Sequence, residues 1–330
     1  MSRLPSYLKR NIRLIDIHSH VGVDPLLYLT KSFPYCNDLR RSRDDCLRVG
    51  VSHSVVFPWV TSVYYHPPSL QKGKVRVGGK VGDAPFHFEN EQMLHQLYEI
   101  FPSYKNMFIP FPLVDTMRET RQQVRVLDRL LRKYPFYGLK VHPRATQVHV
   151  LTLGREGKVI LDFARANNFP ILIHATPSVL DPLSQITDIF QLARENPKIR
   201  FCAAHFCGFH QKLFEEADRM DNVWVDSAAM SIGCDLVLQK SKVYISGREK
   251  IPSDYRSPPK VFAELAQRYS DTFIWGSDNP AHTWVTPAQG NFQRLELWGS
   301  MEREKALLKN VRGRLLQKVA VDNALAFIEG

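Results

Sequence analysis

The chain has 330 residues, of which 44% are hydrophobic and 23% are charged. These proportions are close to the average of folded globular proteins, so long disordered segments are not expected. Its 44 Lys and Arg residues exceed its 33 Asp and Glu residues, which gives a net charge of +11 with neutral histidines. A positive charge of this size is compatible with nucleic acid, anionic lipid or an anionic small molecule as partner, and by itself it excludes none of them.

The residue pattern argues against two classes of protein. No stretch reaches the roughly 18 apolar residues of a transmembrane helix, and the first residues lack the apolar core of a signal peptide. The five cysteines are odd in number and form no CxxC pair, so reduced thiols are expected rather than a disulfide scaffold. We therefore expect a cytoplasmic protein with no membrane partner.

Short apolar segments rich in β-branched residues recur along the chain, each bounded by turn or helix signals. They are apolar on both faces, which is typical of buried parallel strands. Strands are predicted at residues 13–20, 52–59, 107–114, 137–143, 170–176, 199–206, 223–229 and 272–278.

Amphipathic segments lie between these strands. Within residues 116–133, for example, Val124, Leu127, Leu130 and Leu131 recur at steps of three and four and share one face. Alternation of strand and helix predicts a single (β/α)8 TIM barrel domain that spans residues 1–330. An open, doubly wound sheet is the alternative, because counting strands does not show closure. Helices are predicted at residues 39–49, 89–101, 116–133, 156–168, 185–195, 211–220, 259–269 and 301–328.

Two connections are long for a compact barrel, and both follow a strand, which places them at the mouth. Residues 60–88 follow the second strand, are rich in Gly and Lys, and are predicted to form a lid or a wall of the substrate site. Residues 230–258 follow the seventh strand. The basic residues of the two loops that are expected to face an anionic substrate are Lys72, Lys74, Arg76, Lys80, Lys240, Lys242, Arg248, Lys250 and Arg256.

Polar residues occur where the predicted strands end. The first strand carries Asp16, His18 and His20 at alternate positions, so these side chains share one face. Two imidazoles at a strand end can bind one metal ion through neutral ring nitrogens, although such a pair alone has low specificity. Burial of further ionisable groups at the same mouth would be costly without a function. Those groups end the fourth, fifth, sixth and eighth strands: Lys140, His142, His174, His205 and Asp278.

The motifs IDIHSH, GLKVHP, ILIHAT, AAHF and WGSD, in this order along the predicted strands, resemble those of the amidohydrolase superfamily. The resemblance is to its amidohydrolase-related branch of metal-dependent hydrolases, which includes aminocarboxymuconate-semialdehyde decarboxylase-like enzymes. It extends from residue 13 to the closing helix. It implies a TIM barrel and a divalent metal, whereas the motifs do not specify the reaction.

The resemblance also implies roles for individual residues. His18, His20, His174 and Asp278 would bind a divalent metal, and Zn²⁺ is the metal expected for histidine and carboxylate ligands. Asp278 would in addition act as the general base towards a water molecule.

Two further residues have alternative roles under this resemblance. His205 would either bind a second metal or contact the substrate or the attacking water. Lys140 lies where dinuclear members carry a carboxylated lysine that bridges two metals, and an uncarboxylated amine that orients the substrate is equally compatible. Lys140 and His205 would also stabilise a developing oxyanion. Either one or two metals per chain are therefore expected.

Three residues are placed around this site by their position alone. Asp16 lies one step deeper than His18 and is expected to hold a ligand in register. His142, which shares the face of Lys140, either contacts the substrate or packs against its neighbour. Arg144, just past the fourth strand, is a candidate for binding an anionic substrate.

These features predict a metal-dependent hydrolase that activates a water to cleave an amide, lactone or ester bond of a small carboxylated substrate. The alternative is a metal-dependent, non-oxidative decarboxylase of an aromatic or unsaturated acid, in which His205 helps to protonate carbon. A nucleic-acid partner is the third hypothesis, and the absence of RNP, helix-turn-helix and zinc-finger patterns disfavours it. The oligomeric state is open, and a homo-oligomer is one option.

Overall fold

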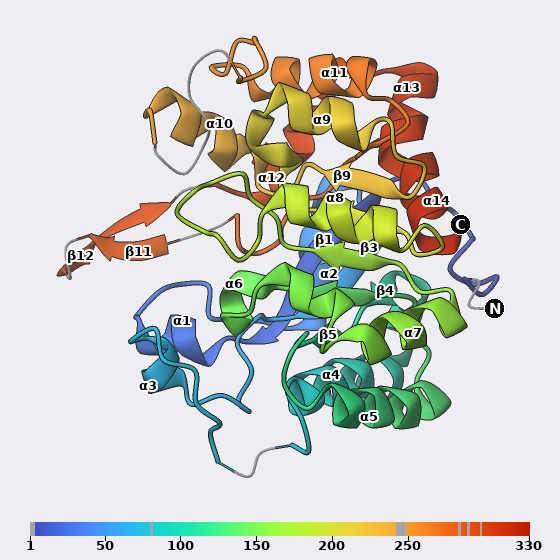
Figure 1. Ribbon diagram of the computed structural model, residues 1–330. Coiled ribbons are helices and arrows are strands. Elements are labelled where there is room, and N and C mark those ends of the chain that lie inside the picture. Colours follow the sequence, from blue (N-terminus) through green and yellow to red (C-terminus); the bar gives the residue numbers. More distant parts are fainter. Residues whose placement is uncertain (1–3, 80–81, 242–248, 283–284, 289–290, 298) are drawn as a thin grey trace.

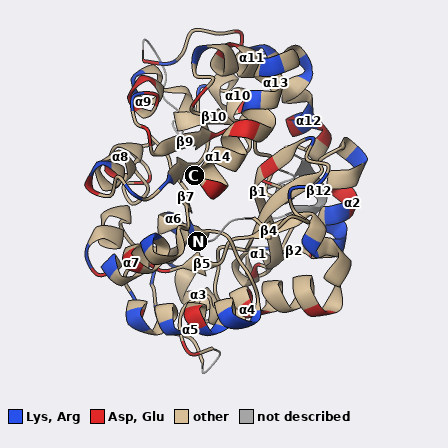
Figure 2. Ribbon diagram, turned by 90° about the vertical axis from the view of Figure 1, so that its right-hand side faces the viewer, with Lys and Arg blue, Asp and Glu red and all other residues tan. Residues whose placement is uncertain are grey.

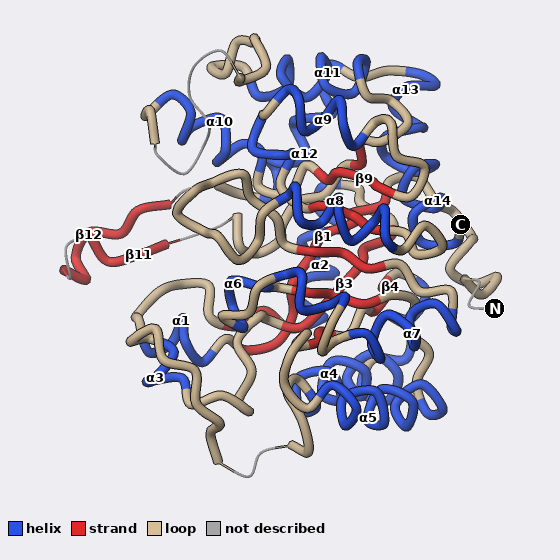
Figure 3. Tube along the Cα trace, viewed as in Figure 1, coloured by secondary structure: helices blue, strands red, loops and turns tan. Residues whose placement is uncertain are grey.

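The computed structural model describes residues 4–79, 82–241, 249–282, 285–288, 291–297 and 299–330, with central strands surrounded by helices (Figure 1 and Figure 3). Each predicted strand overlaps one observed strand, except that residues 107–114 form two short strands. The prolines at positions 110 and 112 lack an N–H, which explains this interruption. The parallel strands are β1 (Ile15–Val23), β3 (His53–Pro58), β4 (Phe108–Pro110), β5 (Leu113–Val114), β6 (Leu139–Val141), β7 (Ile171–Ile173), β8 (Phe201–Ala203), β9 (Val223–Asp226) and β10 (Phe273–Ile274).

These strands pair in two sheets that are joined at both edges. One sheet has the order β2-β1-β3-β4, in which the short β2 (Cys36–Asn37) is antiparallel to β1, and the other has the order β10-β9-β8-β7-β6-β5. At one seam, Phe111 N donates to Val56 O, and Pro112 O accepts from Lys140 N, each at 2.8 Å. At the other seam, the backbone after β10 hydrogen bonds with β1. The resulting ring of strands confirms the predicted TIM barrel.

The helices that cover this ring begin and end close to the predicted positions. Helix α2 (Leu39–Val49) has the predicted bounds because Asp38 accepts a hydrogen bond from Arg41 N at its start and Gly50, with φ of 80°, ends it. The others are α4 (His87–His95), continued by the π-helix η1 (Gln96–Ile100), α5 (Thr120–Lys133), α7 (Lys158–Asn167), α8 (Ile186–Glu195), α9 (Gln211–Ala217) and α11 (Pro258–Arg268).

The segment predicted to be helical at residues 301–328 consists of several helical elements with a break between them. Val311 and Arg312 adopt extended backbone and Gly313 has a positive φ of 55°, so the helix is interrupted there. The observed elements are α12 (Met301–Ala306), η5 (Leu307–Asn310), α13 (Gly313–Gln317), η6 (Lys318–Asp322) and α14 (Asn323–Glu329).

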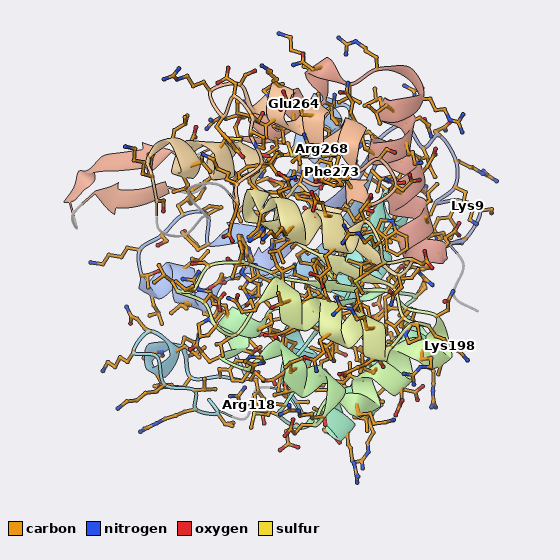
Figure 4. All side chains as sticks on the ribbon, turned by 45° about the horizontal axis from the view of Figure 1, so that its top comes forward. Lys9, Arg118, Lys198, Glu264, Arg268 and Phe273 are labelled. Carbon is orange, nitrogen blue, oxygen red and sulfur yellow. The ribbon has the colours of Figure 1, made fainter. Side chains whose placement is uncertain are left out.

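The helices bury their apolar faces against the strands. In α5, Leu127 and Leu130 are 2% exposed, whereas Val124 and Leu131 are partly buried at the edge of the same face. Charged residues lie on the outer helices, as the blue and red segments of α2, α5 and α7 in Figure 2 show. Figure 4 shows a further exposed charged side chain, Lys198, in the turn after α8 on the outside of the barrel. Among the described residues, no helix combines the length and apolar character that crossing a membrane requires.

Elements that the sequence did not predict lie in the connections. Helix α1 (Pro25–Leu29) follows β1, and α3 (Pro67–Leu70) lies within residues 60–88. Residues 230–258 were predicted as a loop but begin with helix α10 (Met230–Leu238), which starts after a left-handed residue and has no side-chain cap to signal it. A hairpin of β11 (Val285–Ala288) and β12 (Asn291–Leu297) projects from the body of the molecule (Figure 1).

Glu304 of α12 is a buried carboxyl group that we expect to make stability depend on pH. It accepts hydrogen bonds from Ser231 N and Ser231 Oγ, and burial raises the pKa of Glu304 from 4.5 to about 8. Between these values the folded protein keeps a proton that the unfolded chain releases, so the free energy of unfolding falls as the pH rises. We expect Glu304→Gln to lack this fall, which has a limiting slope of about 1.4 kcal/mol per pH unit.

Urea unfolding of both proteins from about pH 5 to about pH 9 tests this expectation. Stability of the wild type should decrease relative to that of the variant across this range. Parallel stability profiles would show that Glu304 does not retain its proton on folding.

Candidate metal centre

The strand ends bring together two histidines and one carboxylate. His18 Nε2 and His20 Nε2 each lie 3.3 Å from Asp278 Oδ1. One ligand atom from each of the three residues falls within 4.8 Å of the others, and all three residues are buried. Two imidazole nitrogens and a carboxylate oxygen are a donor set that suits a divalent transition metal.

A β-bulge in β1 contributes to this placement. The pairing with β3 shifts between Asp16 and Ser19, so one extra residue is inserted into β1 next to His18. Asp16 Oδ1 accepts hydrogen bonds from His18 N at 3.1 Å and from Ser277 N at 2.9 Å. Asp16 thus ties the bulge to the residue that precedes Asp278.

Both histidine rings are oriented by contacts on the side away from Asp278. His18 Nδ1 lies 2.8 Å from Asp226 Oδ2, and His20 Nδ1 lies 3.4 Å from Pro58 O. His20 also stacks on Trp59, with ring centroids 5.1 Å apart. Because each Nδ1 faces an acceptor, each Nε2 keeps a lone pair towards the shared point, as a metal requires.

Asp226 is the residue that the sequence interpretation missed. It is fully buried at the end of β9 and, besides His18, its Oδ1 accepts hydrogen bonds from His205 N at 2.9 Å and Ala228 N at 3.0 Å. The signal was present, because Asp226 ends an apolar strand in the same way as His174 and Asp278.

Asp278 is held in its ionised form. Burial opposes ionisation, but the nearby imidazoles of His18 and His20 outweigh it and hold the pKa of Asp278 below its ordinary value. The carboxylate is therefore available both as a ligand and as a proton acceptor.

A left-handed turn presents His205 at the end of β8. His205 and the next four residues, which include Phe206, all have φ between 43° and 68°. Such a run is strained outside glycine, so surrounding contacts must hold it. His205 Nδ1 lies 3.0 Å from Ala228 O, and the ring of Phe206 packs where a Cβ on Gly233 would lie 2.4 Å from it. These contacts fix the imidazole of His205.

His174 faces the same cavity but stands apart from the three-residue group. Its Nδ1 lies 2.9 Å from His205 Nε2, and its ring stacks on His142 with centroids 3.9 Å apart. The structure thus places His174 beside the predicted ligands without including it in the compact group.

Lys140 is fully buried between these groups. Its Nζ lies 3.2 Å from His18 Nε2 and 4.3 Å from the centroid of the Phe57 ring. Burial lowers the pKa of Lys140 to about 8, against the opposing effect of Asp226 and Asp278. The neutral amine, which is the form that reacts with carbon dioxide, is therefore accessible near neutral pH.

The groups surround a cavity of 440 Å³, within the usual range for small-molecule sites. The elements α1, α3 and α6 (Pro143–Thr146), which contribute to its walls, lie on the left in Figure 1, opposite the chain termini. Its lining consists of His18, His20, Asp24, Leu26, Leu27, Trp59, Val60, Thr61, Leu70, His142, Arg144, Ala145, Gln147, His174, His205, Asp278 and Ala281.

The loop cations do not line this cavity, although Arg144 does. Tyr65 pairs with Val77, so the segment between them folds back on itself and leaves its basic side chains exposed. The position of a residue in a loop that follows a strand therefore did not predict whether its side chain faces the cavity. The described loop cations that do not line the cavity are Lys72, Lys74, Arg76, Lys240, Lys250 and Arg256. The other three predicted cations, Lys80, Lys242 and Arg248, lie outside the described residues.

The contact between Asp226 and His18 predicts a specific defect. In Asp226→Asn the acceptor that fixes His18 Nδ1–H is weakened, so metal affinity should fall about 10- to 100-fold. Competition with a chromogenic chelator measures this affinity. Asp218→Asn, which removes a carboxylate bound to Thr272 on the outside of the barrel, is the matched control. Equal affinities in the two variants would show that Asp226 does not orient His18.

Comparisons with solved structures agree with the barrel. A putative 2-pyrone-4,6-dicarboxylic acid hydrolase from Pseudomonas putida has 16% identity and a TM-score of 0.55 over 96% of this chain and 98% of its own. For 5-carboxyvanillate decarboxylase from Sphingomonas paucimobilis the identity is 10% and the TM-score is 0.61, over 96% of this chain and 99% of that one. For an uncharacterised TIM-barrel protein from Bordetella bronchiseptica the identity is 12% and the TM-score is 0.55, over 95% of this chain and 97% of that one. At these identities the likeness establishes the fold alone.

No curated protein sequence matches the chain significantly. The family model described as amidohydrolase matches residues 51–329, which is most of the chain and includes every candidate site residue outside β1. The chain therefore belongs to the amidohydrolase family.

Proposed function

We propose that this chain is a metal-dependent hydrolase that cleaves an amide, lactone or ester bond of a small carboxylated substrate. The observation that carries the proposal is the group of His18, His20 and Asp278, whose donor atoms lie within 4.8 Å of one another beside a 440 Å³ cavity. The exposed Arg144 on the cavity wall supports a carboxylated substrate. The five unpaired cysteines support a reducing, cytoplasmic location for the enzyme.

The residues present fit a divalent metal. His18, His20 and Asp278 would hold it, His174 would complete the set, and Zn²⁺ suits these donors. When bound, such an ion supplies a water of lowered pKa and a positive charge opposite a developing oxyanion.

The side chains then have distinct tasks. Asp278, ionised and at the mouth, accepts a proton from the water whose oxygen attacks the substrate carbonyl carbon. It returns that proton to the nitrogen or oxygen of the leaving group as the scissile bond breaks. Lys140 lies close enough to His18 to donate to the substrate oxyanion, and His205 Nε2 accepts a hydrogen bond from His174 Nδ1, which orients that ligand.

Lys140 determines how many metals the proposal requires. If its neutral amine adds carbon dioxide and releases a proton, the resulting carbamate would supply further oxygen ligands, and a second ion would then be expected. If it remains an amine, one ion is expected and Lys140 orients the substrate.

Non-oxidative decarboxylation is the second candidate. Its supporting observation is that only one three-residue group in the described part of the chain is arranged for a metal, as a one-metal lyase needs. In that reaction the bond between carbon and the carboxylate breaks, carbon dioxide leaves, and a proton replaces it on carbon.

Two measurements on protein purified without chelator separate the candidates. Metal content is determined per chain, and lactones, amides and aromatic acids are screened with detection of both released acid and carbon dioxide. We expect acid release without carbon dioxide. Carbon dioxide release from an aromatic acid would replace hydrolysis by the lyase.

A further inference from the structure

Four of the five histidines around the cavity place their lone pair on Nε2. A carbonyl oxygen only accepts, so His205 Nδ1, at 3.0 Å from Ala228 O, carries the hydrogen. His174 Nδ1 donates to the remaining lone pair of His205 Nε2 at 2.9 Å. His18 and His20 likewise donate from Nδ1, to a carboxylate and to a carbonyl oxygen.

His142 has the opposite arrangement. Its Nδ1 accepts a hydrogen bond from Ala145 N at 3.1 Å, and since a backbone N–H only donates, this nitrogen holds the lone pair. The neutral ring therefore carries its hydrogen on Nε2. The same hydrogen bond caps α6, so the fold itself determines the arrangement. Nε2 makes no hydrogen bond to any residue that the structure describes.

The hydrogen bond from Ala145 N requires a neutral ring, because a protonated imidazole would carry a hydrogen on Nδ1 as well. His142 also stacks on His174, which holds the plane of the ring. An uncharged imidazole with a fixed Nε2–H is a hydrogen-bond donor and not a proton acceptor.

We propose that His142 Nε2–H and the Arg144 guanidinium form a subsite that binds a carboxylate of the substrate. Both residues line the cavity from one end of α6, and both offer only donors. A carboxylate offers only acceptors and matches them, whereas an ammonium group does not. That the bound carboxylate belongs to the substrate rests on the proposed function. The direction of the hydrogen bond from Ala145 N to His142 Nδ1 does not depend on it.

The hydrogen on His142 can be located directly in the zinc-loaded 330-residue chain with ¹⁵N-labelled histidine. Long-range ¹H–¹⁵N spectra distinguish the two tautomers, and the signals lost in His142→Phe assign the residue. His149 is an internal control, because its Nδ1 also accepts from a backbone N–H, that of Leu151, and it does not line the cavity. We expect Nε2–H on both residues, and a hydrogen on Nδ1 of His142 would overturn the proposal.

Benzoate and benzylamine then probe the subsite as an anion and a cation of similar size. Benzoate should shift the His142 signals with saturation and leave those of His149 unchanged, and benzylamine should shift neither. Arg144→Met, which leaves the cap of α6 intact, should weaken benzoate binding about tenfold. His149→Phe should leave that affinity unchanged.

Benzoate binding that is independent of Arg144, or equal binding of benzylamine, would reject the subsite. Absence of hydrolysis together with the expected tautomer and benzoate dependence would reject the hydrolase and retain the subsite. The proposed function and the proposed subsite can therefore be rejected independently of each other.

Discussion

Asp278→Asn is expected to reduce turnover by about 10³-fold while the chain remains folded. Asp278 Oδ1 lies 3.3 Å from the Nε2 atoms of both His18 and His20, so the substitution removes the negative member of the ligand group and the proton acceptor together. Its backbone has φ of 66°, a left-handed conformation that asparagine adopts more readily than most residues. The variant should therefore lose function without backbone strain.

The control for this variant is Asp271→Asn, an exposed carboxylate paired with Lys318 on the outside of the barrel. Steady-state turnover, metal content and circular dichroism are compared in the two proteins. The control should match the wild type in all three. Wild-type turnover in Asp278→Asn would remove this carboxylate from the mechanism.

Lys140→Ala is expected to lower turnover about 10²-fold or more and, if the lysine is carboxylated, to release one of two metals. Lys140 Nζ lies beside His18 Nε2, so a carbamate there would present its oxygens to the ligand group. Short carboxylic acids should then restore metal content and part of the turnover. Lys140→Met, which conserves the buried volume, shows whether any loss arises from an empty space in the core.

The number of metals separates the two roles of this lysine. Two metals in the wild type and one in the variant support the bridging carbamate. One metal in both proteins would reject it, and we would then place decarboxylation ahead of hydrolysis.

Much of the barrel could be predicted because its signals are local. The apolar runs around His18, His174 and Asp278 are short and end in polar residues, which is how buried parallel strands meet a functional mouth. Helix α2 carries a capping aspartate and a terminal glycine, so its ends were also predictable.

What could not be predicted depends on tertiary contacts. The left-handed turn at His205 is held by Ala228 and by the space at Gly233, residues distant in sequence. The bulge in β1 appears only in its pairing with β3. Alternation along a strand therefore indicated the shared face of His18 and His20 but not the local insertion that places them.

The direction of loop side chains was also beyond sequence reasoning. Arg144 reaches the cavity because α6 begins immediately after β6, whereas Lys72 and Lys74 lie on a segment that turns back to the surface. Both kinds of position follow a strand in sequence. Only the path of the backbone distinguishes them.

We expect His18, His20, His174 and Asp278 to share one divalent metal. A crystal structure of the zinc-loaded protein, with anomalous diffraction recorded on both sides of the zinc absorption edge, tests this directly. We predict an anomalous peak within about 2.3 Å of donor atoms from all four residues. A zinc ion bound elsewhere, with these four side chains arranged as in the present structure, would contradict this expectation.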